Sequence, residues 1–172
     1  MKHLLPASQA LLIALVTSSC AGYQLGGTKP PSLATVKTVS VPMFRNGTLH
    51  PREEALATSA VADAFVADGT YRISTADHAD AVLEGKVTTI DYTPLRSSRL
   101  DSLLAEELTG TVRIEWVLKD ARDPTKVLAS GSSAGRSSFF VDSNLQTARQ
   151  NALPDAFERA GQALVSRLSS GF

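Results

Sequence analysis

The clearest pattern of apolar and polar residues lies between residues 108 and 119. Apolar side chains alternate there with Thr, Arg, Glu and Lys: Leu108, Val112, Ile114, Trp116 and Leu118. A period of two is typical of a β-strand with one face on a core and the other in water. The polar segment Asp120–Thr125 predicts a turn, and Val127–Val141 predicts an antiparallel partner strand that Gly131, Gly135 and five serines weaken.

Three further strands are predicted in the first half of the chain. Thr35–Val41 is rich in β-branched residues and ends at Pro42, and Tyr71–Ser74 and Ala81–Tyr92 follow. The first strand-helix-strand unit should form a right-handed parallel crossover.

Two amphipathic helices are predicted. The first starts at Pro51, carries two carboxylates in its first turn and ends at Gly69, with an apolar stripe of Leu56, Ala60, Val61, Ala64 and Phe65. The second covers Ser143–Leu168, with Leu145, Ala148, Ala152, Ala156, Ala160, Leu164 and Leu168 near one side. Pro154 should kink it or mark a second helix start, because proline lacks the N–H and clashes with the preceding turn.

The order of these elements predicts an α/β (α+β-like) fold. We expect a two-layer sandwich, in which a mixed sheet of four to five strands carries both helices on one face. The segment Thr93–Glu107 shows no good periodicity at its start, and we expect it to form an extended hairpin end or a mobile loop.

The N-terminus is typical of a bacterial lipoprotein signal. Cys20, the only cysteine, follows the apolar run Leu11–Val16 and three small residues, and the run is too short to span a membrane. We therefore expect residues 1–19 to be a signal peptide, 20–34 a lipidated tether and 35–172 one domain. Because Thr17 stands where such signals usually have Leu, a plain secretory peptide cut nearby is the alternative, which would leave a free thiol.

Charge and composition exclude some classes of function. The chain has 17 Lys and Arg against 17 Asp and Glu, and removal of residues 1–19 takes Lys2 away and leaves a net charge of −1. Nucleic-acid binders carry a basic surface, so no nucleic-acid partner is expected. A single cysteine leaves no disulfide within the chain.

No catalytic or metal site is predicted, and no cofactor motif is present. Gly131–Gly135 matches the G-x-S-x-G nucleophile motif around Ser133, but both flanks read as strand and no histidine follows His78. Asp77, His78 and Asp80 are too few to hold a metal without further ligands. The sequence therefore favours a non-enzymatic protein.

Several short segments of the sequence, taken in order, resemble one family. They are Cys20 followed by Gly22–Gly26, then Val39–Thr48, then Pro51–Glu54 at a helix start, and Ala79–Val87. Together they are similar to the LPS-assembly lipoprotein family, LptE. The resemblance implies an outer-membrane lipoprotein, held by its lipid anchor, that sits inside the lumen of the LptD β-barrel facing the periplasm. It would plug that barrel, help it assemble and assist lipopolysaccharide delivery to the outer leaflet.

Lipopolysaccharide carries phosphates, which arginine binds in bidentate geometry. Arg96 and Arg99, with Leu100, Leu103 and Leu104 beside them, form the best candidate cluster for lipopolysaccharide, and Arg136 near Phe139 and Phe140 forms the second. Solvated arginines in ion pairs are the alternative for each. A different class of function also stays open: a periplasmic lipoprotein that activates a cell-wall synthase or scaffolds a secretion pore.

Overall fold

The sheet and helices of the protein form two layers. The computed structural model describes residues 29–97, 105–141 and 144–171. Its helices are α2 (Glu53–Asp68) and α3 (Leu145–Ser170), and its strands are β1 (Thr38–Ser40), β2 (Arg45–Asn46), β3 (Arg72–Ile73), β4 (Ala81–Ser97), β5 (Ala105–Asp120) and β6 (Val127–Phe140). Short 3-10 helices cover Pro31–Leu33 and Ala76–His78.

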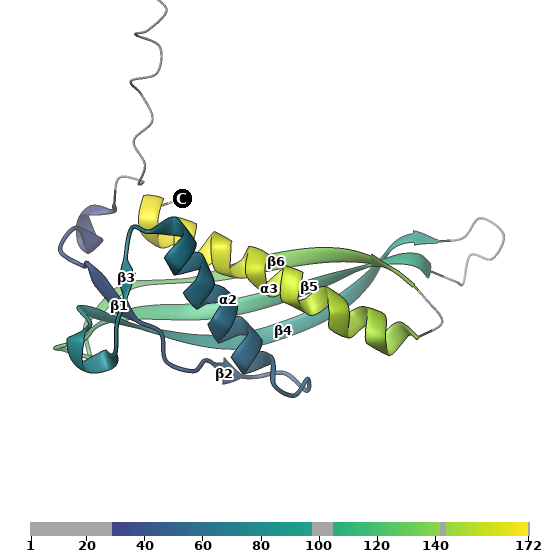
Figure 1. Cartoon of the computed structure of the whole chain (residues 1–172), viewed down its shortest axis with the longest axis horizontal. Helices are drawn as coiled ribbons and strands as arrows, with labels where there is room; N and C mark the ends of the chain where they lie inside the picture. Colours follow the sequence, from purple (N-terminus) through teal and green to yellow (C-terminus); the bar gives the residue numbers. More distant parts are fainter. Residues whose placement is uncertain (1–28, 98–104, 142–143, 172) are drawn as a thin grey trace, which may run out of the picture.

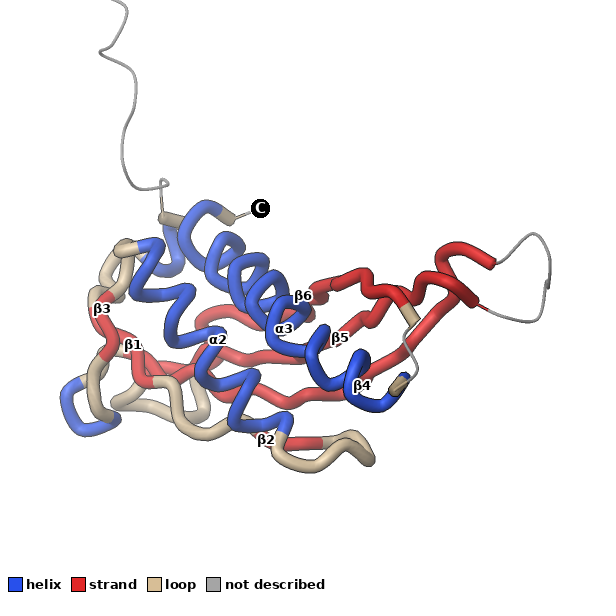
Figure 2. The backbone as a smooth tube through the Cα atoms, turned by 45° about the vertical axis from the view of Figure 1, so that its right-hand side comes forward, coloured by secondary structure: helices blue, strands red, loops and turns tan. Residues whose placement is uncertain are grey.

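Both helices lie on the same face of a mixed sheet (Figure 1; Figure 2), which confirms the predicted α+β sandwich. The strand order is β3-β1-β4-β5-β6, with β2 also pairing with β4. The described sheet therefore has six strands rather than four or five. The additional strand is β2, which contains only two residues, too few to leave a periodic signal.

The long strands β4, β5 and β6 form an antiparallel meander. The alternation predicted for β5 is confirmed, since Leu108, Val112, Ile114, Trp116 and Leu118 are all buried. Strand β4 continues to Ser97, beyond the predicted end at Tyr92, and Arg96 pairs with Glu107 on β5. The described part of the segment 93–107 is thus the extended end of a hairpin.

The parallel part of the sheet is short. Strand β1 pairs in parallel with both β3 and β4, which confirms a parallel crossover through α2. Strand β1 begins at Thr38 rather than Thr35, because the chain before it turns through the 3-10 helix and buries Leu33 in the core. The last residues of the expected tether therefore pack against the domain. The Asp80 carboxylate fixes the start of β1 by accepting the backbone N–H groups of Lys37 and Thr38, both at 2.9 Å.

Helix α2 ends as predicted but buries a slightly different face. Gly69 has φ 72° and donates its N–H to the Phe65 carbonyl, a common helix end. Val61, Ala64 and Phe65 are buried as predicted, whereas Leu56 remains 37% exposed and Ala57 is buried instead. One residue turns the helix by about 100°, so Leu56 points away from the line that Ala57 and Val61 follow.

Helix α3 runs unbroken from Leu145 to Ser170, although Pro154 lies inside it. The Asn144 side chain caps its start by accepting the Thr147 N–H at 3.1 Å. The helix lies very close to β6, because a Cβ atom on Gly135 would stand only 2.0 Å from the Ala156 carbonyl oxygen. Alanines on α3 and glycine on β6 permit this approach.

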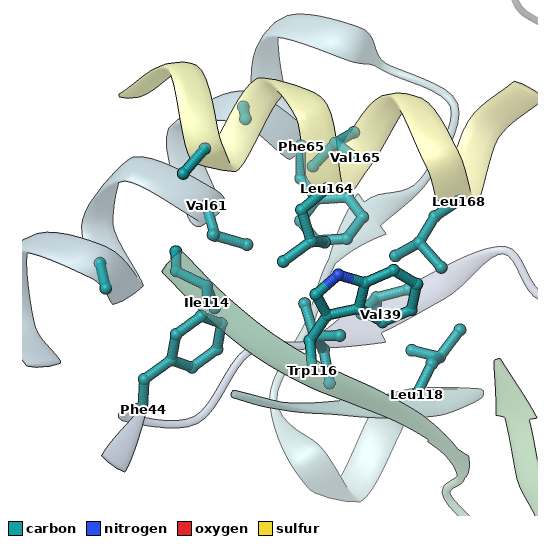
Figure 3. Close-up of a cluster of buried hydrophobic side chains, with 14 of the residues drawn as sticks. Val39, Phe44, Val61, Phe65, Ile114, Trp116, Leu118, Leu164, Val165 and Leu168 are labelled. Carbon is teal, nitrogen blue, oxygen red and sulfur yellow. The ribbon is translucent and has the colours of Figure 1, made fainter. Parts of the chain in front are cut away.

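Trp116 is a buried core residue that packs below α3 (Figure 3). It pairs with Gly85 on one side and Gly131 on the other. A Cβ atom on Gly131 would lie 2.7 Å from the indole Cζ2, and one on Gly85 would lie 2.5 Å from Phe44. The indole N–H donates to the Ser133 hydroxyl at 3.1 Å. The glycines of β6, expected only to weaken the strand, therefore make room for the indole and for α3.

Candidate functional site

The face of the sheet turned away from the helices is polar, and no described helix covers it (Figure 2). Pairing and alternation place on it residues of the three long strands: Glu84, Lys86, Thr89, Asp91 and Thr93 of β4, Glu107, Thr109, Thr111, Arg113, Glu115, Val117 and Lys119 of β5, and Ser130, Ser132, Ala134, Arg136, Ser138 and Phe140 of β6. We call these residues the open sheet face.

Cross-strand contacts order the open sheet face. The Lys119 ammonium lies 2.8 Å from a carboxylate oxygen of Glu84. The hydroxyls of Thr109 and Ser138 are 3.1 Å apart. Exposed pairs of this kind add little to stability, about 0–1 kcal/mol each. Their effect is to hold hydroxyl, carboxylate and cationic groups in a fixed array that a polar partner surface can meet.

Arg136 lies on the open sheet face and is exposed. Its neighbours differ from the expected ones, because successive residues of a strand point to opposite faces. Phe140, 72% exposed, shares the face of Arg136. Phe139 instead points to the helix side, where its ring meets Tyr92 edge-on at 6.0 Å. Of the two phenylalanines predicted beside Arg136, only Phe140 therefore lies on the same face of the sheet.

Arg96 and Arg99 are only partly placed. The backbone of Arg96 lies in β4 opposite Glu107, which in turn pairs with Phe140. Arg99, Leu100, Leu103 and Leu104 lie outside the described residues. From strand spacing, the Cα atoms of Arg96 and Arg136 are about 16 Å apart. The hairpin end and Arg136 thus belong to the same end of the sheet without forming one compact cluster.

A cluster of aromatic and charged residues lies beneath the first turns of both helices. The Tyr92 ring meets His50 edge-on at 6.2 Å, and the Arg149 guanidinium carbon lies 4.9 Å from the Tyr92 ring centre. Sequence reasoning missed this cluster, because its members come from a loop, β4 and α3. The only local signal was the alternation that places Tyr92 opposite Gly110 on the helix side.

Glu53 adds a buried carboxylate to this cluster. It is 7% exposed, and one of its oxygens has no hydrogen-bond partner, as is also true of Arg149 Nε. Burial raises the pKa of Glu53, while His50 lowers that pKa and Glu54 raises it. Burial likewise raises the pKa of Tyr92, with Glu53 adding to the rise and Arg149 opposing it. An ionised Glu53 is therefore a cost to the fold.

The G-x-S-x-G segment is a strand and not a nucleophile elbow. Ser133 lies inside β6, is 5% exposed and accepts the Trp116 indole N–H. The Asp80 carboxylate binds Lys37 and Thr38, and no group of three His, Cys, Asp or Glu residues in the described part of the chain could hold a metal ion.

A shallow groove of about 350 Å³ runs between the outer sides of the two helices. Alanines of α2 and Leu56 line it, together with the carboxylates Asp63 and Glu158. None of the described helices is long and apolar enough to cross a membrane. Cys20, the predicted lipidation site, lies outside the described residues.

Fold and surface together define an α+β domain that offers a broad polar sheet face for binding. A family model described as LptE, lipopolysaccharide-assembly, matches residues 36–168. The chain belongs to this family. Membership indicates a bacterial outer-membrane lipoprotein with a role in lipopolysaccharide assembly.

Two solved structures share the fold at low sequence identity. A hypothetical protein from Chlamydia trachomatis is 8% identical with a TM-score of 0.54, and the match covers 77% of this chain and 95% of the other. A protein from Xanthomonas campestris is 16% identical with a TM-score of 0.52, covering 81% and 87%. Among curated proteins, none matches the chain.

Proposed function

We propose that this chain is a lipid-anchored, non-enzymatic subunit that plugs an LptD-type outer-membrane β-barrel, helps it assemble and assists lipopolysaccharide delivery to the outer leaflet. The observation that carries the proposal is the family match over residues 36–168. In this proposal residues 1–19 are removed, Cys20 carries the lipid, and the domain sits in the barrel lumen facing the periplasm.

The open sheet face supports this proposal. The interior of a large membrane barrel is polar, so a domain inside it must pair its surface groups with polar groups of the wall. The open sheet face offers serine and threonine hydroxyls and ordered charges over three long strands. A protein held in water alone would tolerate the same surface, which is why the family match and not the polarity carries the proposal.

Contact with lipopolysaccharide is proposed at the hairpin end and along β6. Arg136 is exposed and no carboxylate of the described residues lies within salt-bridge distance of it. Phe140 stands four residues further along the same face, about 13 Å away. An exposed cation followed by an exposed aromatic ring fits a phosphate joined to apolar chains. Arg96 and Arg99 would extend this contact along the hairpin.

Affinity purification from native outer membranes tests the subunit role. The wild-type chain should bring down a β-barrel protein in stoichiometric amount. A chain that comes down without any barrel protein would contradict the proposal. Intact-mass analysis of the same material should show acyl mass on Cys20, and Cys20→Ser should leave an unlipidated or unprocessed precursor.

Lipopolysaccharide binding is tested by charge reversal. Arg136→Asp, and separately Arg96→Asp with Arg99→Asp, should weaken binding of purified lipopolysaccharide at least tenfold, because each charge-assisted hydrogen bond contributes about 1.5–3 kcal/mol. Arg122→Asp is the matched control, since Arg122 is also exposed but lies in the turn at the opposite end of β5. Equal affinity in the control and in both test variants would remove these arginines as ligands.

A further inference from the structure

Among the described residues, strand β6 is the long free edge of the sheet. It ends the strand order and contains 14 residues, whereas the opposite edge strand, β3, contains only two. Edge strands expose backbone groups that can pair with another chain. The 14-residue edge of β6 therefore exposes many more unpaired backbone groups than the two-residue edge of β3.

Alternate residues of β6 direct their backbone groups outward. Across the β5–β6 hairpin the Asp120 N–H donates to the Lys126 carbonyl at 3.0 Å, and on the other side the Ala121 N–H donates to Asp80 on β4. Even-numbered residues of β5 thus bond to β6, and their partners are the odd-numbered residues 129–139. The outward N–H and C=O groups belong to Ser130, Ser132, Ala134, Arg136, Ser138 and Phe140.

One of these outward groups, the Ser132 carbonyl, is bonded by a side chain of α3. The Arg167 guanidinium, from the C-terminal part of α3, donates to the Ser132 carbonyl at 3.1 Å. Beyond it, the described residues provide no hydrogen-bond partner for the backbone of Ala134, Arg136 or Ser138.

The devices that usually protect an edge strand are missing from this stretch. Charged side chains, proline and bulges are the common ones. Residues 129–140 contain no proline and a single charge, Arg136. Their pairing with β5 is continuous, since the only register shift lies between Leu118 and Lys119 of β5. The edge is regular enough to accept another strand.

We propose that the edge of β6 from Ala134 to Phe140 binds an extended segment of a partner polypeptide as an added strand, with an acidic residue of that segment beside Arg136. Arg136 is the only charge along the edge, so an opposite charge on the added strand stabilises the pair. A hollow lined by Phe140, Val141, Asn144, Thr147 and Asn151, with Ala148, continues the edge and would receive a side chain of the added strand.

Charge also argues against a second copy of this chain as the occupant. Antiparallel pairing of two β6 edges centred on residue 136 would place two arginines opposite each other, and like charges directly opposite are destabilising. The inference rests on the proposed function in one respect, that the partner is the barrel subunit. A closed barrel wall has no free strand, so the added segment must come from a part of that subunit outside the wall.

Hydrogen exchange resolved to single amides tests the inference. In the isolated chain, the amides of Ala134, Arg136 and Ser138 should exchange rapidly, while their odd-numbered neighbours are protected by β5. In the complex purified from native membranes, these three amides should slow by about 100-fold or more. The alternating pattern is specific, because cover by side chains alone would not protect every second amide.

Proline substitution provides the matched variants. Ala134→Pro and Ser138→Pro each remove an outward N–H at an edge, where proline is tolerated, and should reduce recovery of the barrel subunit at least tenfold. Ala134→Thr and Ser138→Thr keep the N–H and should retain it. If a proline variant unfolds, as shown by Trp116 fluorescence, Arg136→Glu replaces it and should also reduce recovery.

The outcomes separate the two proposals. Recovery of a barrel subunit with rapid exchange at Ala134, Arg136 and Ser138 would overturn the added strand and leave the proposed function standing. A photo-crosslinker at position 138 in intact cells decides the case in which no barrel subunit is recovered. A cross-link to one acidic segment, lost in Ala134→Pro, supports the added strand, whereas no cross-link, or one to a second copy of this chain, overturns it.

Discussion

Replacing Gly135 by alanine should push helix α3 away from the sheet. The new Cβ atom would stand 2.0 Å from the Ala156 carbonyl oxygen and 2.5 Å from the Ala160 nitrogen. Both are backbone atoms of one helix, so no side-chain rotation can relieve the contact. The helix must move by about 1 Å, and a gap of that size forfeits a quarter to a half of each dispersion contact along the interface.

The expected loss can be estimated from these contacts. Adding a methyl group to a well-packed core costs about 1–3 kcal/mol, and a contact with rigid backbone belongs at the upper end. Replacing glycine by alanine also raises the free energy of unfolding by about 0.4–1 kcal/mol, because alanine restricts the unfolded chain. The free energy of unfolding should therefore fall by about 2–3 kcal/mol. Urea unfolding followed by fluorescence of Trp116, the only tryptophan, measures it.

Gly110→Ala is the matched control. Gly110 is also a buried glycine inside a strand, but its new Cβ would lie 3.3 Å from Tyr92 Cε1, a side-chain atom that can shift by a few tenths of an ångström. Its free energy of unfolding should change by less than about 1 kcal/mol. Equal losses in the two variants would refute the argument that backbone contact with α3 requires glycine at position 135.

Three further tests, all by urea unfolding, address the core and the titrating carboxylates Glu53 and Asp80. Ile114→Ala should lower the free energy of unfolding by about 2–5 kcal/mol and Thr111→Ala by far less, because only Ile114 faces the helices; equal losses would contradict the register. The raised pKa of Glu53 means that its contribution to stability is present at low pH and lost as the pH rises through the folded-state pKa. Glu53→Gln should therefore gain stability relative to wild type above about pH 5, and a constant difference would refute this. For Asp80 the sign is opposite: hydrogen bonds from Lys37 and Thr38 lower its pKa, so its contribution is present above about pH 4 and lost in acid. Asp80→Asn should consequently be less sensitive to acid than wild type, and equal acid sensitivity would argue against this role.

The long strands and helices could be predicted because the periodicity of apolar residues depends on which face of one element is buried. The alternation around Ile114 fixes which face of β5 meets the helices, and the glycine at position 69 fixes the end of α2. The same reasoning failed where burial depends on the neighbour. Leu56 is apolar and was predicted in the buried stripe, yet it remains 37% exposed and lines the groove between the helices.

The candidate site was harder to predict because its parts meet only in three dimensions. The sequence indicates Arg136 as a candidate lipopolysaccharide ligand beside Phe139 and Phe140, but the contact of Phe139 with Tyr92 depends on β6 lying two strands from β4. From the sequence, Glu53 is an ordinary first-turn carboxylate, since nothing in it places His50 and Tyr92 near this carboxylate. The free edge of β6 is likewise a property of strand order and not of the serine-rich segment itself.

The two ends of the domain differ in what they offer a partner. At one end the chain enters the fold beside the last turn of α3, where the Lys29 ammonium lies 4.5 Å from the Tyr71 ring centre and the Tyr71 hydroxyl donates to the Leu168 carbonyl at 2.6 Å. At the other end of the long axis, β4 and β5 continue past the helices (Figure 1).

The two ends of the domain lie at different distances from the proposed lipid anchor. With the lipid on Cys20, as we propose, the residues between it and Lys29 span at most about 30 Å. A strand of 16 residues such as β5 spans about 50 Å. The entry end of the domain is therefore held near the bilayer surface, while the hairpin and the free part of β6 can lie much further from it. That separation fits a subunit that inserts into its partner, because its binding groups are carried away from the anchor along the axis of the sheet.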